Sequence, residues 1–95
     1  MSISKFRFNK RRKHPSYVFK EKNNKYHCII ITHSKTTKSK ANIPLYKNPQ
    51  REKKKQAYLV PKIYKDEKSF YGKKINNFSF HKFDKRKVKH IKEHK

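Results

Sequence analysis

Two groups of side chains in this sequence are of types that act on phosphate esters. His14 follows the three cations at positions 11–13 and precedes Pro15. Histidine changes its protonation near neutral pH, which suits it to transfer protons. Thr32 and Ser34 end the most apolar run of the chain, where hydroxyl and backbone N–H groups can hold a phosphate. A surface histidine or a strand-ending threonine also occurs without such a role, making only local hydrogen bonds.

Two predicted strands would position these groups. Residues 16–20 predict a strand with Tyr17 and Phe19 on one face and Ser16 and Val18 on the other. The β-branched, nearly all-apolar run 26–32 predicts a central strand covered on both faces. Asn23-Asn24 between them suits a hairpin turn, because asparagine tolerates positive φ. If the two strands pair, His14 and Thr32 would lie near each other at one rim of the sheet.

The other apolar segments predict further strands. Residues 42–46 and 57–64 have strand character, with Pro44 favouring an edge position and Pro61 a bulge. Loops and turns are expected in the polar or lysine-rich stretches 35–41, 48–56, 66–67 and 70–72.

The C-terminal segment predicts a helix capped by Ser79. Its apolar residues share one face at helical spacing: Phe80, Phe83, Val88 and Ile91. Residues 1–13 are expected to form a basic arm or a short edge strand, and residues 14–95 one small domain. The predicted fold class is mainly β (α+β), a small SH3-like curved sheet or barrel with a C-terminal helix.

The high positive charge of the chain predicts a polyanionic ligand. Twenty-nine lysines and arginines against six acidic residues give a formal charge of +23, which attracts polyphosphates. Thirteen phenylalanine and tyrosine residues argue for a folded domain rather than a disordered tail. We expect RNA, with single strands favoured and DNA as an alternative. The residues expected to contact it are Arg11, Arg12, Lys13, Ser34, Lys35, Lys53, Lys54, Lys55, Tyr17 and Tyr46.

Several classes of function are disfavoured. Cys28 is the only cysteine, and it lies in the apolar run, where a buried structural thiol is expected. Six carboxylates and one glycine disfavour a metal centre or a glycine-rich phosphate loop, so no cofactor is expected. The chain has neither a run of about twenty apolar residues nor a secretory signal pattern, which predicts a cytoplasmic protein that does not enter membranes.

The order of the apolar blocks resembles a known family. The blocks are residues 14–19, 28–34, 42–45, 57–63 and 73–79. In this succession the chain is similar to the PemK/MazF family of RNA-cleaving toxins. The resemblance implies an SH3-like barrel, a homodimer, an acidic antitoxin as partner, and metal-independent cleavage of single-stranded RNA by 2′-OH attack. The arginine that precedes proline in the family falls on His14, and the catalytic threonine falls on Thr32.

Two alternatives remain open. The chain could be a non-catalytic basic RNA- or DNA-binding protein of a ribosomal or mobile-element type, since the charge alone explains binding. It could also be a small phage or plasmid inhibitor that binds an acidic protein. If it is a nuclease, His14 transfers a proton to or from the RNA, and Thr32, with Ser34, stabilises charge on the phosphate.

Overall fold

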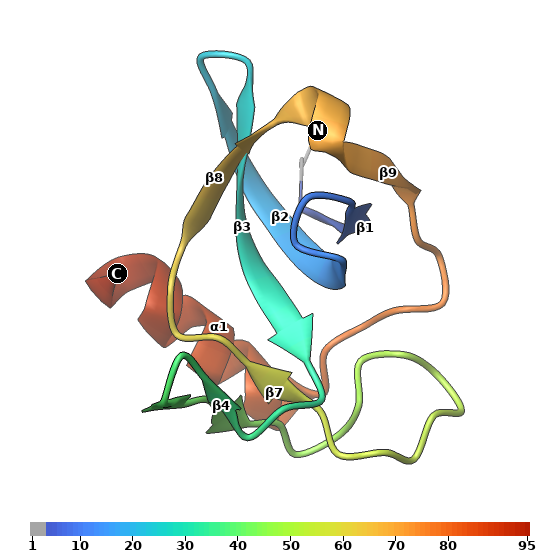
Figure 1. Cartoon of the computed structure of the whole chain (residues 1–95). Helices are drawn as coiled ribbons and strands as arrows, with labels where there is room; N and C mark the ends of the chain where they lie inside the picture. The colour runs from blue at the N-terminus through green and yellow to red at the C-terminus, as the bar shows by residue number, and fades with distance from the viewer. Residues whose placement is uncertain (1–3) are drawn as a thin grey trace.

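The computed structural model describes residues 4–95, which form a curved antiparallel sheet with one helix packed against it (Figure 1). The predicted class, mainly β within an α+β arrangement, is confirmed. The elements are β1 (Lys5–Asn9), β2 (His14–Lys22), β3 (Lys25–Thr32), β4 (Thr36–Thr37), β5 (Lys40–Ala41), β6 (Ile43–Pro44), β7 (Tyr58–Leu59), β8 (Tyr64–Glu67), the 3-10 helix η1 (Lys68–Phe70), β9 (Tyr71–Lys74) and α1 (Lys82–His94).

Strands β2 and β3 form the predicted hairpin. Asn23 and Asn24 make its turn with φ values of 53° and 62°, in the left-handed region that asparagine tolerates. Near the other end of the hairpin, Ser16 faces Ile30.

Strand β3 is the central strand that the sequence predicts. It pairs with β2 along one side and with both β7 and β8 along the other. Because side chains alternate along a strand, Ile29 and Ile31 enter one core cluster, while Cys28 and Ile30 enter a second on the opposite face. Cys28 is a buried free thiol, as expected, and its Sγ lies 3.1 Å from the hydroxyl of Tyr71.

The chain connects two edges of the curved sheet, strands β8 and β9, through one short helix. Strand β1 lies between β2 and β9, while β8 pairs with β3, and the short helix η1 links β8 directly to β9 (Figure 1). The sequence predicts either a basic arm or a short edge strand for residues 1–13. Residues 5–9 are instead an internal strand with partners on both sides, because β9 pairs along the second side of β1. Residues 1–3 of the predicted arm lie outside the described part of the chain.

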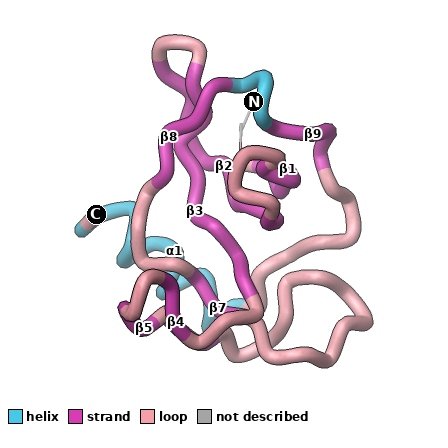
Figure 2. Tube along the Cα trace, viewed as in Figure 1, coloured by secondary structure: helices cyan, strands magenta, loops and turns pink. Residues whose placement is uncertain are grey.

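Four expected loops or strands differ in detail. Residues 35–41 contain the small hairpin β4–β5 rather than a plain loop, and residues 66–67 belong to β8. Residues 70–72 do not form a turn, because Phe70 ends η1 and β9 begins at Tyr71. The predicted strand 57–64 is interrupted around Pro61, so it supplies β7 and the start of β8. Figure 2 shows the long irregular segments that remain, including residues 48–56.

Helix α1 begins later than predicted. His81, not Ser79, is the capping residue, and its side chain accepts a hydrogen bond from the Phe83 N–H. The buried positions of the helix are Asp84, Val88 and Ile91, and Phe83 is 49% exposed. None of the helices in the described residues is long and apolar enough to cross a membrane.

Candidate functional site: a basic histidine cleft

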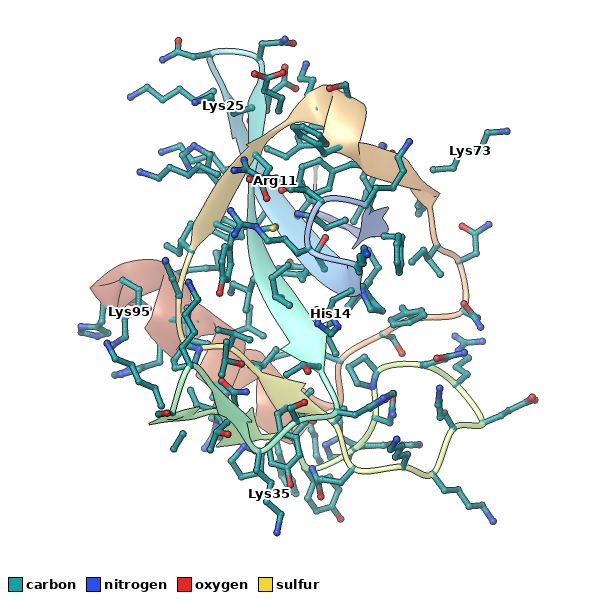
Figure 3. All side chains as sticks on the ribbon, in the orientation of Figure 1. Arg11, His14, Lys25, Lys35, Lys73 and Lys95 are labelled. Carbon is teal, nitrogen blue, oxygen red and sulfur yellow. The ribbon has the colours of Figure 1, made fainter. Side chains whose placement is uncertain are left out.

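The β2–β3 register brings His14 and Thr32 together. His14 begins β2 and Thr32 ends β3, and the pairing of Ser16 with Ile30 places these two ends at the same rim. In Figure 3, His14 lies beside the tip of β3. Both residues line the same two adjoining clefts, so the sequence-based expectation that they lie close together holds.

The tight loop between β1 and β2 sets the position of His14. Asn9 accepts two backbone hydrogen bonds there: its carbonyl oxygen from the Lys13 N–H at 2.7 Å, and its side-chain Oδ1 from the Arg12 N–H at 3.0 Å. Lys13 has a φ of 61°, which turns the chain back into β2 immediately before His14. The loop is therefore built around Asn9, which is fully buried.

Asp66 of β8 anchors the same loop from below. Its carboxylate, which has no exposed side-chain surface, accepts hydrogen bonds from Arg12 Nε and Nη2 at 3.1 Å, Arg11 Nη1 at 3.2 Å and Asn9 Nδ2 at 2.9 Å. Burial alone would raise the pKa of Asp66, but the hydrogen bonds from Arg12 and Asn9 and the arginine charges outweigh it and hold that pKa below its ordinary value. Two arginines predicted to contact RNA are thus also structural partners of one buried acid.

The larger of the two clefts is basic and contains two histidines. It has a volume of about 320 Å³, and its polar lining includes Lys13, His14, Thr32, His33, Ser34 and Lys53. The second cleft, of about 220 Å³, is shared between His14 and Thr32 on one side and Arg12, Lys38 and Lys62 on the other. Neither lining includes a carboxylate among residues 4–95, so both clefts favour an anion.

Thr32 is a nearly buried residue that lines both clefts. It is only 5% exposed, and its Oγ1 accepts the Ser34 N–H at 3.2 Å, so the hydroxyl retains its own hydrogen as a donor. Buried Asn42 fixes the following segment, since its Nδ2 donates to the Ser34 carbonyl at 3.0 Å and to Thr37 Oγ1 at 2.8 Å.

His33 is the residue that sequence reasoning missed. It directly follows Thr32, lines the larger cleft, and lies close enough to His14 to respond to its charge. Partial burial of the otherwise exposed His33 ring, followed by the charges of Lys53, Lys55 and His14, lowers the pKa of His33. The signal was present in the sequence as a histidine between the two hydroxyl residues already singled out.

The loop of residues 48–56 brings Lys53 to the cleft. Asn48 holds this loop internally, donating from Nδ2 to the Lys55 carbonyl at 2.8 Å and accepting the Gln50 N–H at 2.9 Å. The Arg51 N–H donates to the Asn77 carbonyl at 2.9 Å, which ties the loop to the chain preceding α1.

The other predicted contact residues lie elsewhere. Lys35, Lys54 and Lys55 are exposed but outside both cleft linings, and Figure 3 shows Lys35 far from His14. Tyr17 packs against the rings of Phe6 and Phe80, at centroid distances of 5.3 and 5.1 Å, and is partly buried against the core. Tyr46 is exposed on a different part of the surface, near the start of α1.

Metal-ligand geometry and similarity to known proteins were two further sources of information about this site. Within residues 4–95, no three His, Cys, Asp or Glu side chains are grouped so that they could hold a metal ion. No protein-family model, curated protein or solved structure matches the chain.

Proposed function

We propose that this protein binds single-stranded RNA and cleaves it by attack of a ribose 2′-hydroxyl on the adjacent phosphate, with protein side chains transferring the protons. The observation that carries the proposal is the convergence of His14, Thr32 and His33 on one basic cleft without a carboxylate in its described lining. This is activity of the PemK/MazF type, and it needs no metal ion.

In the proposed reaction His33 is the general base and His14 the general acid. His33 takes this role because it lines the cleft beside His14 and its lowered pKa favours the neutral imidazole that a base requires. It removes the proton of the 2′-OH as that oxygen bonds to phosphorus. The P–O5′ bond breaks, and His14 gives its proton to the departing 5′-oxygen. The products are a 2′,3′-cyclic phosphate and a 5′-hydroxyl, and no other reactant is consumed.

Thr32 and the cleft lysines stabilise the charge that develops on the phosphate. Thr32, Lys13 and Lys53 line the same cleft as the two histidines. Fixed donors of this kind are worth about 10²–10³ in rate when they face a developing oxyanion. A cleft of about 320 Å³ has the size of a small-ligand site and suits one nucleotide of an unpaired strand.

The test is incubation of the purified protein, in EDTA, with end-labelled single-stranded RNA. We expect fragments with 2′,3′-cyclic phosphate ends from the natural protein, and no fragments from His14→Ala, Thr32→Ala or His33→Ala. His27→Ala is the matched control, because His27 lies on the same strand β3 and outside both clefts. RNA carrying a 2′-deoxyribose at the cleaved position should stay intact.

A second candidate is a non-catalytic RNA- or DNA-binding protein. The formal charge of +23 favours it, because phosphate neutralisation by lysines suffices for binding. Intact RNA that is bound equally by the natural protein and the three cleft variants would support this candidate and contradict the nuclease.

A further inference from the structure

Three aromatic rings form an exposed cluster outside the histidine cleft. Tyr46 is 65% exposed and Phe83 is 49% exposed, and the partly exposed ring of His81 contacts both. The ring centroids are 4.6 Å apart for Tyr46 and His81, 5.1 Å for Tyr46 and Phe83, and 4.8 Å for His81 and Phe83. Exposed aromatics normally occur singly on a surface, so a mutually packed group of three calls for an explanation.

The backbone holds this ring cluster in place from beneath. The buried carboxylate of Asp84 accepts the Tyr46 N–H at 2.7 Å and the Lys47 N–H at 3.1 Å, which ties residues 46–47 to the first turn of α1. The Phe83 N–H donates to His81 Nδ1 at 3.2 Å. The rings are therefore positioned before any ligand arrives, which lowers the entropy cost of binding.

Positive charge surrounds the ring cluster. Lys82 Nζ lies 5.6 Å from the Phe83 ring centroid, and Lys47 adjoins Tyr46. His81 also lines a cleft of about 360 Å³, whose charged residues are Lys47, Arg51 and Glu52, two cations against one carboxylate. Asn48 lines both this cleft and the histidine cleft, so the two clefts lie on either side of one residue.

We propose that Tyr46, His81 and Phe83 form a base-stacking platform for single-stranded RNA, a second subsite for the strand that enters the histidine cleft. Unpaired bases stack on exposed aromatic faces, and the neighbouring cations bind the phosphates between those bases. This deepens the proposed function and rests on it for the identity of the ligand. An acidic peptide would use the cations but does not supply flat rings to stack.

The test measures binding without chemistry. Fluorescence anisotropy with a 2′-O-methyl oligouridine of about 12 nucleotides, which cannot be cleaved, reports affinity for the natural protein, Tyr46→Ala, Phe83→Ala and the double variant. We expect about tenfold weaker binding for the double variant. Phe8→Ala is the control, because Phe8 is also exposed but lies in β1, outside the cluster. Circular dichroism should be unchanged, since Asp84 holds the backbone rather than the ring of Tyr46.

Inorganic polyphosphate and poly-glutamate separate stacking from charge. Affinity for polyphosphate should be the same in all variants, because it offers charge without bases. Unchanged oligouridine binding in the double variant, or an equal loss for polyphosphate or poly-glutamate, would overturn the platform. RNA cleavage, measured separately with the His14 and His33 variants, decides the nuclease whatever the result here.

Discussion

At the scale of single residues, the proposed chemistry requires a histidine that stays neutral on a very basic surface. Burial and the charges of Lys53, Lys55 and His14 lower the pKa of His33. Because a base acts only when deprotonated, the acid limb of the kcat/KM profile for RNA cleavage should lie below pH 6.5, the ordinary histidine value. In Lys55→Gln one of the depressing charges is lost, so the limb should move to higher pH.

Lys54→Gln is the control for this pH profile. Lys54 carries the same charge on the same loop, yet it is not among the charges that lower the pKa of His33. Initial cleavage rates measured across the acid and neutral range in constant ionic strength give both profiles. Equal acid limbs in the two variants would assign the limb to a group other than His33.

Asp66 makes a residue-scale prediction about stability. Replacing it by Asn should cost about 2–3 kcal/mol of unfolding free energy, because Arg12 and Arg11 lose their shared charged acceptor. Glu67→Gln, the same loss of charge at an exposed position of β8, should cost little. Urea unfolding at neutral pH measures both.

The pH dependence of this difference has a definite sign. The pKa of Asp66 is held below its ordinary value of 3.8, so its contribution is fully present above that pH and is lost as the pH falls below it. The unfolding curves of the natural protein and Asp66→Asn should therefore converge in strong acid. A gap that stayed constant down to low pH would contradict the ion-pair account.

At the scale of elements, patterns within a short stretch of sequence predicted the structures that residues close in sequence determine. The β2–β3 hairpin was predicted from the apolar run 26–32, the Asn23-Asn24 turn and the strand character of residues 16–20. That hairpin brings His14 close to Thr32. Long-range partners decided the rest. Residues 5–9 became an internal strand because β9, more than sixty residues later, pairs with them.

Helix α1 illustrates the same limit. Its apolar residues predicted a buried face containing Phe83, but the buried stripe is Asp84, Val88 and Ile91. A carboxylate occupies this buried stripe because it accepts the N–H groups of Tyr46 and Lys47 and the ammonium of Lys87. No local pattern around Asp84 predicts that its carboxylate accepts hydrogen bonds from residues nearly forty positions earlier. In the same way, the sequence predicted a loop at Asp66 and gave no sign of its pairing with Arg11 and Arg12.

The helix makes a prediction of its own. Ile91 is fully buried against the core that includes Ile29 and Leu59, so Ile91→Ala should cost about 2–5 kcal/mol of unfolding free energy. Phe83→Ala should cost about 0.5 kcal/mol or less, because the ring is half exposed and lies on the surface cluster. Thermal unfolding compares the two variants. A larger loss of stability for Phe83→Ala than for Ile91→Ala would mean that Phe83 packs in the core, as part of the apolar helix face that the sequence predicted.

At the scale of the whole molecule, a charge of +23 makes every nucleic-acid affinity dependent on salt. A single strand that contacts about six phosphates should show a slope near −4 in a plot of log affinity against log salt. The affinity should then fall by about two orders of magnitude between about 50 and 200 mM salt. Lys53→Gln removes a cation from the histidine cleft, so its slope should be shallower by about 0.7. Lys73 is an exposed residue of β9 that lies outside both clefts (Figure 3), so Lys73→Gln should leave the slope unchanged. Equal slopes for the Lys53 and Lys73 variants would mean that RNA does not favour the cleft.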